Sequence, residues 1–431
     1  MFKRVFQKWD IILAGLAIRL CIAPFTGHPC DMPLWGTFGK AILVEHANPY
    51  ATFPYPPPWI LITGFTYGIY LLLPSEPFLN FILKLPIILG DILLGITLHA
   101  IVQDLSSSRK KANYATALFL LNPYVIWISS VWGMFDALPA LCTLLALRSF
   151  LKGNEKVSAL FLGLGIAFKY YPILLLPVFL ILGWKRERKI DFILRYALYA
   201  GLPLIVTSTP FLILDWQSYL RQIFSAPLMT HKWWSIPASY LASIYLLEYI
   251  SPDLFSQLTS NFWWSNALSY GIFSILYIFV MLRLYHEDEQ SISKFLNNGI
   301  MAVLLVTLLS SKIVCEQYFQ WIVPFMIIDF SVFTSENKSF FDILWPSFFA
   351  FFSINVPIYN FFPDVQKRTY NYMGFLAPLV DFYEMSVPDV FKRTALFLLG
   401  LTISVTFALY LKKILGNTLS KIEEQPNRVF S

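Results

Sequence analysis

The chain has 431 residues, of which 57% are hydrophobic, 18% aromatic and only 13% charged. A water-soluble fold could not bury this much apolar surface, so the composition excludes soluble enzymes and indicates an integral membrane protein. The sequence also lacks the motifs GxxxxGK[ST], GxGxxG and HExxH, which mark nucleotide and zinc sites in soluble enzymes.

The net charge of +6 comes largely from short basic clusters at the ends of apolar stretches. That placement is a topology signal and not a nucleic-acid surface, because basic loops stay in the cytoplasm. It leaves the segment around Asp31 on the extracytoplasmic side. The clusters are Lys3, Arg4 and Lys8; Arg109, Lys110 and Lys111; Lys185, Arg186, Arg188 and Lys189; and Lys412 and Lys413.

Apolar stretches recur along the chain without a polar insert of domain size. We therefore expect one membrane-embedded domain over residues 1–431, with a catalytic N-terminal module at 1–214 and variable helices and outer loops at 215–431. The expected fold class is all-α, a polytopic bundle of about 11–13 spans at roughly 20 residues each, with broken or re-entrant helices. The spans are placed near 10–26, 57–73, 77–102, 113–130, 134–152, 192–214, 262–284, 296–310, 318–333, 340–358 and 391–411.

The first hydrophobic stretch is followed by His28-Pro-Cys-Asp-Met-Pro-Leu-Trp35, then Asn48-Pro-Tyr50 and Tyr55-Pro-Pro-Pro58. We interpret this region as an aromatic and proline-rich extracytoplasmic loop that presents the carboxylate of Asp31. The alternative role for Asp31 is to cap a short loop helix.

Residues 157–184 are apolar but have basic clusters at both ends, so both ends should lie on the same face. Phe168-Lys-Tyr-Tyr-Pro172 divides them into two legs of about a dozen residues, each about 18 Å long and too short to cross a core of about 30 Å. We expect a broken element with Lys169 deep in the membrane, facing a cavity. Two regions allow two interpretations each. Residues 57–102 form either one re-entrant element or two spans, and residues 215–261 form either an interfacial loop or an amphipathic helix.

Few ionisable residues lie inside the apolar segments, and each requires a partner or a function. Lys84 with Asp91, and Lys312 with Glu316, could neutralise each other. Lys169 has no acidic residue within two helical turns, which favours a role in anion binding. Arg19 is more typical of a structural anchor.

The ordered set of motifs resembles the GT-C glycosyltransferases that use dolichyl- or polyprenyl-phosphate sugars. Within them it resembles most closely the first mannosyltransferase of GPI-anchor assembly, and it is also similar to the glucosyltransferases of N-glycan precursors. The matching motifs are Asp31, Asn48-Pro-Tyr50, Tyr55-Pro-Pro-Pro58, Lys84 to Asp91, Leu121-Asn-Pro123, Ser129-Ser-Val-Trp-Gly-Met-Phe-Asp136, Phe168-Lys-Tyr-Tyr-Pro172 and Lys312-Ile-Val-Cys-Glu-Gln-Tyr-Phe-Gln-Trp321.

The resemblance implies an inverting transfer of a hexose, with mannose favoured over glucose, to a lipid-linked or protein-linked glycan. Asp31 would act as the catalytic base. The expected donor-phosphate ligands are Lys169, Lys312, Arg221 and His231, and the expected substrate-binding residues are Tyr55, Asp136, Tyr170, Glu316, Gln317, Tyr318 and Trp321.

One departure from the family pattern concerns metal binding. The mannosyltransferases carry Asp-x-Asp where this chain reads Pro29-Cys30-Asp31, so a paired-carboxylate metal site is not expected. A lipid monophosphate carries less charge than a nucleotide diphosphate and can be neutralised by lysine or arginine. We therefore expect no obligatory metal and no cofactor. The four cysteines, without CxxC spacing, indicate neither a zinc site nor a disulfide framework.

The expected partners are the lipid-phosphate sugar, the glycan or glycolipid acceptor and membrane lipids, with no nucleic acid. The expected location is the plasma membrane of a prokaryote or the endoplasmic reticulum of a eukaryote, with the site on the extracytoplasmic face. Two other functions remain open. One is a transporter or flippase of lipid-linked sugars, since carriers also use broken helices. The other is a noncatalytic GT-C-like subunit, which would be indifferent to substitution of Asp31.

Overall fold

The computed structural model describes residues 7–51, 55–225, 250–260, 262–287, 291–311, 314–355, 378 and 386–416. These residues form α-helices with short 3-10 and π-helical turns, and no β-strand occurs among them. The predicted all-α fold class is therefore confirmed for the described part of the chain. His231 and Lys312, two of the predicted phosphate ligands, lie outside the described residues.

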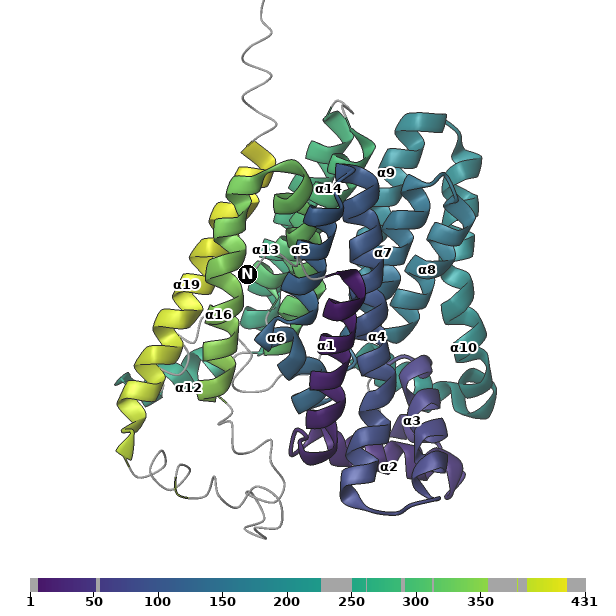
Figure 1. Ribbon diagram of the computed structural model, residues 1–431, viewed down its shortest axis with the longest axis vertical. Coiled ribbons are helices and arrows are strands. Elements are labelled where there is room, and N and C mark those ends of the chain that lie inside the picture. Colours follow the sequence, from purple (N-terminus) through teal and green to yellow (C-terminus); the bar gives the residue numbers. More distant parts are fainter. Residues whose placement is uncertain are drawn as a thin grey trace, which may run out of the picture. The chain divides into compact units, whose positions relative to one another are not determined.

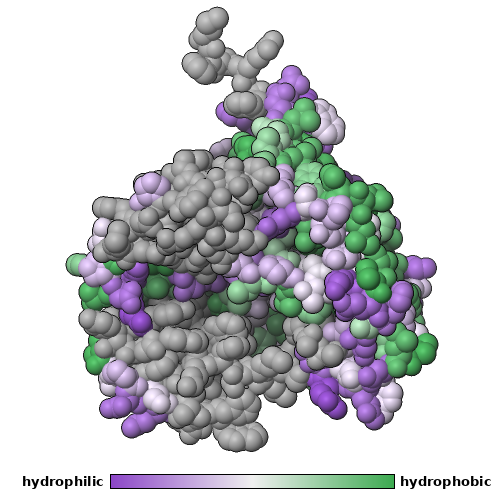
Figure 2. Space-filling model, turned by 90° about the horizontal axis from the view of Figure 1, so that it is seen from below, coloured by the Kyte–Doolittle hydropathy of each residue, from purple (hydrophilic) through white to green (hydrophobic). Residues whose placement is uncertain are grey.

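Five described helices are long and apolar enough to cross a membrane. A sixth span results if α5 (Arg109–Leu120) and the following stretch Pro123–Trp132, bent by 47°, count as one. Green hydrophobic residues reach the rim of the face seen in Figure 2, as expected for helices in contact with lipid,. The chain is a multi-pass membrane protein. The five helices are α4 (Glu76–Ser106), α10 (Ile190–Ser225), α13 (Phe262–His286), α14 (Ile292–Ser310) and α19 (Asp389–Gly416).

The chain divides into two compact units, each built from separate stretches of sequence. The first consists of residues 1–173, 193–229 and 352–389, and the second of residues 174–192, 230–351 and 390–431. The first unit contains Asp31, Asp136 and Lys169 and therefore the predicted catalytic residues.

In the first unit, the segment that we expected to be a loop contains a helix. After α1 (Lys8–Ile22) and the 3-10 turn η1 (Ala23–Phe25), α2 runs from Asp31 to Leu43. The two glycines and the proline of α2 argue against a helix in the sequence. However, Pro33 lies in the first turn, where backbone N–H groups need no helical partner.

Helix α2 packs against α3 (Pro57–Tyr70), and the two lie side by side at the lower end of Figure 1. The contact is close enough that a Cβ on Gly39 would lie 2.5 Å from the carbonyl oxygen of Thr63. Residue 39 therefore has to be glycine for α2 to reach α3, and the stretch predicted as loop is shaped by this packing.

The region 57–102 forms two helices, α3 and α4, and not one re-entrant element. The chain turns between them, and Pro77 occupies the first turn of α4, where proline is tolerated,. Lys84-Leu-Pro86 does not break α4, which continues through Pro86 to Ser106. Helix α3, with 14 residues, would be about 21 Å long and is shorter than a full span,.

The predicted interruption of residues 157–184 is confirmed. Helix α8 (Glu155–Phe168) ends at Lys169, whose backbone is extended with φ −157° and ψ 141°. A 3-10 turn, η4 (Tyr171–Leu175), precedes α9 (Leu176–Glu187). Pro172 has no N–H to donate to the carbonyl of Phe168, so a continuous helix would lack a hydrogen bond at this point. Helix α7 (Ala137–Leu151) precedes α8 and packs against it.

The second unit contains the three apolar helices α13, α14 and α19 together with shorter elements. A buried Asp329 accepts hydrogen bonds from the hydroxyl of Tyr410 (2.7 Å) and the amide of Asn337 (2.6 Å). Phe340 stacks on Tyr410 and joins α16 to α19, which lie side by side in Figure 1. The shorter elements are α12 (Pro252–Ser260), η8 (Glu316–Trp321), α15 (Val323–Ile328), η9 (Asp329–Phe333), η10 (Ser335–Asn337) and α16 (Lys338–Asn355).

Candidate active site

The carboxylate of Asp31 is held by two side chains through one of its oxygens. Oδ2 accepts a hydrogen bond of 2.6 Å from Nε1 of Trp132 and lies 3.0 Å from Nδ1 of His28. No described residue is hydrogen-bonded to Oδ1, and the side chain is 24% exposed. The capping position of α2 is taken by Cys30, and the Asp31 side chain does not bond the backbone of its own helix. Oδ1 therefore has no hydrogen-bond donor within the described part of the chain.

Opposing influences act on the pKa of Asp31. Burial raises it, but the hydrogen bonds and charge of His28, the hydrogen bond from Trp132 and the positive charge of Lys169 lower it by more. The pKa of Asp31 consequently lies below its ordinary value. At neutral pH the group is a carboxylate, which is the form that a proton acceptor requires.

The ring of Trp132 is held by two stacking contacts. His28 stacks on it at a centroid distance of 4.7 Å and Phe352 at 4.8 Å. The backbone N–H of His28 also donates to the carbonyl oxygen of Trp132 at 3.0 Å. The indole N–H that holds Asp31 therefore has a fixed direction.

The turn after Trp132 requires a glycine. Trp132 ends the π-helical turn η3 (Trp127–Trp132), which follows the short helix α6 (Pro123–Ile126). Gly133 then adopts φ 93°, and a Cβ at this position would lie 2.3 Å from the sulfur of Met32. A side chain at position 133 would thus be strained and would also displace the side chain of Met32 in α2,.

Lys84 connects the segment that precedes α2 with the turn η3 that contains Trp132. It is fully buried in α4, and its ammonium group lies within hydrogen-bonding distance of five neutral oxygens. The prediction that Lys84 neutralises Asp91 was wrong, because Lys84 is solvated by oxygens from η1 and η3. The acceptors are the carbonyls of Ala23, Thr26, Ser130 and Val131 and the hydroxyl of Thr26.

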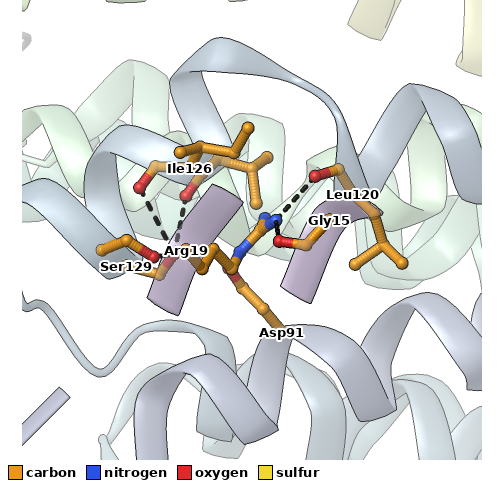
Figure 3. A network of polar contacts seen from close by, with 8 residues as sticks. Gly15, Arg19, Asp91, Leu120, Ile126 and Ser129 are labelled. Atoms are coloured by element: carbon orange, nitrogen blue, oxygen red, sulfur yellow. Dashed lines mark hydrogen bonds and ion pairs between the residues drawn. The ribbon is translucent and has the colours of Figure 1, made fainter. Parts of the chain in front are cut away.

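The partner of Asp91 is Arg19, a residue 72 positions earlier in the chain. Nε of Arg19 lies 3.0 Å from Oδ2 of Asp91, and both side chains are fully buried. Nη1 donates to the carbonyl oxygens of Gly15 and Leu120, as Figure 3 shows. Arg19 therefore joins α1, α4 and α5, in agreement with its expected role as a structural anchor.

Lys169 has an acidic partner that its position in the sequence did not reveal. Its ammonium lies 2.7 Å from Oδ1 of Asp136, and both residues are buried. Asp136 occupies the capping position of α7, but its side chain makes no capping hydrogen bond. The absence of an acidic residue within two helical turns therefore did not leave Lys169 without an acidic neighbour in the fold. The positive charge of Lys169 also lowers the pKa of Asp31, and both the predicted base and the predicted phosphate ligand lie in the first unit.

Aromatic rings surround the ammonium of Lys169. It lies 5.7 Å from the ring centroid of Tyr55 and 5.4 Å from that of Phe135, both within the range of cation–π attraction,. Trp35 and Trp59 extend this wall, with their rings 5.8 Å and 4.6 Å from Phe135. These rings provide apolar faces of the kind on which sugars stack.

The motif Asn48-Pro-Tyr50 supports the position of Tyr55. Asn48 accepts from the backbone N–H of Tyr50 at 3.0 Å, and the hydroxyl of Tyr50 donates to the carbonyl oxygen of Tyr55 at 3.2 Å. Tyr50 also packs edge-on against Phe211 and Tyr219 of α10. The motif therefore fixes the loop between α2 and α3 against α10.

The remaining predicted residues are less closely tied to this site. Tyr170 is half-buried beside Lys169, and its hydroxyl has no hydrogen-bond partner among the described residues. Arg221 is exposed on α10. Four residues belong to the second unit, where the rings of Tyr318 and Trp321 stack at 4.2 Å. They are Glu316, Gln317, Tyr318 and Trp321.

Sequence reasoning gave no role to His28 or Trp132, although both lie in the motifs that it singled out. The sequence does contain one indication that His28 contacts Asp31, since a histidine three positions before a carboxylate can reach it. It contains no such indication for Trp132, which lies 101 positions from Asp31. Among the described residues, no group of three or more His, Cys, Asp or Glu side chains could hold a metal ion. Independence from metal stays a prediction.

Three comparisons place the chain among known proteins. The family model described as GPI transamidase subunit PIG-U matches residues 40–274, which is more than half of the chain and begins after Asp31. GPI mannosyltransferase 1 of Candida albicans is 27% identical over 256 residues, covering 56% of this chain and 61% of that protein. The chain thus matches less than two thirds of its curated relative. The expected resemblance to a GPI mannosyltransferase is confirmed by the second of these relatives.

A solved structure was also compared. ArnT from Cupriavidus metallidurans bound to undecaprenyl phosphate aligns with a TM-score of 0.46 and 12% identity over 96% of this chain and 78% of that chain.

Proposed function

This chain belongs to the GPI transamidase subunit PIG-U family, and we propose that it is a membrane-embedded glycosyltransferase that moves a hexose from a polyprenyl- or dolichyl-phosphate sugar to a glycan acceptor. Mannose is the favoured sugar, because a relative is a GPI mannosyltransferase. The acceptor is a lipid-linked or protein-linked glycan, and the reaction takes place on the extracytoplasmic face of the plasma membrane or the endoplasmic reticulum membrane.

The observation that carries this proposal is the state of Asp31. Its carboxylate is ionised, it is anchored through Oδ2, and its Oδ1 accepts no hydrogen bond from the described residues. Oδ1 accepts the proton of the acceptor hydroxyl while the hydroxyl oxygen attacks the anomeric carbon. The bond from that carbon to the phosphate oxygen breaks on the opposite face, and its electron pair leaves with the lipid phosphate. The anomeric configuration is therefore inverted.

The leaving phosphate needs a positive charge, and Lys169 supplies it in this proposal. Its contact with Asp136 compensates the buried ammonium when no donor is bound, since an isolated buried charge is costly. The charge of the ammonium also lowers the pKa of Asp31. Preorganised charge of this kind is often the largest catalytic contribution. Arg221, His231 and Lys312 remain proposed as additional ligands of the donor phosphate.

The sugar would lie along the aromatic wall next to Lys169. Tyr55 presents a ring there, Tyr170 a hydroxyl and Asp136 a carboxylate. The further proposed contacts come from Glu316, Gln317, Tyr318 and Trp321. No obligatory metal is included in the proposal, because a single lysine can serve as a point charge for a monophosphate.

A second function is favoured by the family description itself. The matching family model is that of a transamidase subunit, and its match does not include Asp31. On this alternative the chain is a noncatalytic GT-C-like subunit, and the Asp136–Lys169 pair serves only to join α7 to the break after α8. A carrier or flippase of lipid-linked sugars is the third possibility, and it too would transfer no label.

The test uses the full chain in lipid vesicles with radiolabelled polyprenyl-phosphate mannose or glucose and an extracted glycolipid fraction as acceptor. The proposal expects label to move to the glycolipid and expects Asp31→Asn to lose about 10²–10⁴-fold of the rate. Asparagine keeps an oxygen for Trp132 but has no basic carboxylate. Glu45→Gln is the control, because Glu45 is exposed and paired only on the surface with Lys40. Absence of transfer, or an active Asp31→Asn protein, would contradict the proposal.

A further inference from the structure

The second unit contains a buried carboxylate for which the described residues provide no ion-pair partner. Asp329 is 2% exposed, and both hydrogen bonds to its side chain come from neutral groups, the hydroxyl of Tyr410 and the amide of Asn337. No lysine, arginine or histidine in the described part of the chain forms an ion pair with it. A buried charge of this kind is costly unless a positive charge neutralises it.

Two lysines act on Asp329 from beyond contact distance. The charges of Lys294 and Lys413 reach its carboxylate, but the ammonium of Lys413 is bonded to Glu336 at 3.3 Å. Lys294 is half-buried near the start of α14, where solvent screens part of its charge. The negative charge of Asp329 is therefore only partly offset by these lysines.

Two amide oxygens close to this carboxylate accept no hydrogen bond from the described residues. Asn337 donates through its amide nitrogen to Oδ2 of Asp329 at 2.6 Å, which leaves its own Oδ1 unpaired. Asn297 of α14 donates to the carbonyl oxygen of Phe325 at 3.2 Å, the same oxygen that accepts from the backbone N–H of Asp329. Oδ1 of Asn297 is likewise unpaired within the described part of the chain. Both asparagines are almost fully buried.

The contacts of Tyr410 and Met301 connect these groups into one cluster. The hydroxyl of Tyr410 lies 2.7 Å from Oδ2 of Asp329 and 4.0 Å from the sulfur of Met301. The amide nitrogen of Asn297 lies 3.3 Å from the same sulfur. Helices α14 and α19 and the turns η9 and η10 therefore meet around one carboxylate and two amide oxygens. Carboxylate and amide oxygens only accept hydrogen bonds, so none of them can satisfy another.

We propose that this cluster binds a Na⁺ ion, with the carboxylate of Asp329 and the amide oxygens of Asn337 and Asn297 as ligands. Such oxygens suit hard cations, and a single acidic side chain does not make a transition-metal site. One negative charge among neutral oxygens matches a monovalent ion, whereas a divalent ion would bury excess positive charge. Na⁺ is favoured over K⁺ because the ligands are closely packed and a smaller ion needs less space. The site is independent of the proposed transfer reaction.

The first test is thermal unfolding of the full chain in detergent, in NaCl, KCl or choline chloride at one ionic strength. An ion that binds only the folded state raises the melting temperature as its concentration rises. We expect a saturable rise with Na⁺, a smaller one with K⁺ and none with choline. Asp342→Asn is the control and should keep the response, because Asp342 is exposed and pairs with Lys338 on the surface. Equal melting temperatures in the three salts would overturn the proposal.

Two variants of the cluster separate the loss of charge from damage to the packing. Asp329→Asn keeps the shape of the side chain and removes the negative charge, so the response to Na⁺ should disappear. Tyr410→Phe removes one hydrogen bond but keeps the charge and the ring that stacks on Phe340, so the response should remain. Loss of the response in both variants, or in neither, would contradict the assignment of the ligands.

Direct binding of radioactive Na⁺ to the wild type requires no variant to fold. We expect a single bound ion per chain, released as the pH falls because a proton neutralises the same carboxylate. The titratable and charged groups that face Asp329 are Tyr410, Lys294 and Lys413, with Glu336 bonded to Lys413. If no Na⁺ binds at any pH, Asp329 is neutralised by a proton and the proposal is wrong.

Discussion

Nε1 of Trp132 donates a hydrogen bond of 2.6 Å to Oδ2 of Asp31, from a position 101 residues later in the chain. This contact determines which oxygen of the carboxylate is anchored and which is open. Because both His28 and Phe352 stack on the ring of Trp132, the indole N–H has little freedom to follow the carboxylate if it moves. The orientation of the proposed base is therefore set by an aromatic side chain that carries no charge.

Trp132→Phe should preserve the stacking and remove the donor. Because the hydrogen bond from Trp132 lowers the pKa of Asp31, its loss raises that pKa, and a larger fraction of Asp31 is protonated at any given acidic pH. The acidic limb of the pH–rate profile is then expected to move to higher pH. Hydrogen bonds to charged groups contribute about 1.5–3 kcal/mol, so a rate loss of about tenfold at neutral pH is also expected. An acidic limb that stays in place would show that Trp132 does not act on Asp31.

The pair Lys169 and Asp136 allows stability and activity to be separated. Lys169→Met leaves the buried Asp136 without its partner and should destabilise the protein by about 3–5 kcal/mol. Combining it with Asp136→Leu removes both charges and should restore most of the melting temperature. Transfer activity should remain lost in the double variant, because the positive charge for the leaving phosphate is absent. Thermal unfolding in detergent and the transfer assay measure the two effects, and an active double variant would remove Lys169 from the mechanism.

Lys84→Met should lower stability even though the substitution replaces a charge by an apolar side chain inside a membrane helix. The buried carbonyls of Ser130 and Val131 lose a donor, and each unsatisfied buried group costs about 1–3 kcal/mol. Lys40→Met is the control, since Lys40 is exposed and bonded to Glu45 on the surface. Thermal unfolding of both variants gives the comparison, and a Lys84→Met protein as stable as the control would mean that these oxygens need no donor.

Gly39→Ala should separate α2 from α3. The added Cβ would lie 2.5 Å from the carbonyl oxygen of Thr63 and 2.7 Å from Cβ of Tyr67, and overpacking of this kind costs about 1–3 kcal/mol. Gly201→Ala in α10 is the matched control, because its nearest atom lies at 3.9 Å. The melting temperature of the first variant should fall clearly below that of the second. Equal melting temperatures would mean that the two helices can separate without a loss of stability.

Treatment with EDTA should leave transfer activity unchanged, since the proposed leaving-group charge comes from a lysine. The measurement compares initial rates before and after chelation, with Mg²⁺ and Mn²⁺ added back in separate reactions. Loss of activity that a divalent cation restores would show that the phosphate is bound through a metal.

The sequence by itself determined the environment of the protein, the helical class and the position of the break. Composition requires a membrane, and Phe168-Lys-Tyr-Tyr-Pro172 interrupts a helix at Lys169 because proline lacks a donor. All of these depend on local chemistry that can be read within a few residues. The same reasoning failed at α2, where its proline and glycines indicated a loop and close packing against α3 favoured a helix.

Only the tertiary structure decided the partners of the buried charges. Asp91 pairs with Arg19 across 72 positions, Lys169 with Asp136 across 33, and Asp31 with Trp132 across 101. Spacing along one helix suggested Lys84 for Asp91, but the helix that supplies a partner is chosen by packing and not by proximity in sequence. A buried charge selects whichever polar group the fold brings within hydrogen-bonding distance, because inside a membrane protein water is not there to replace it.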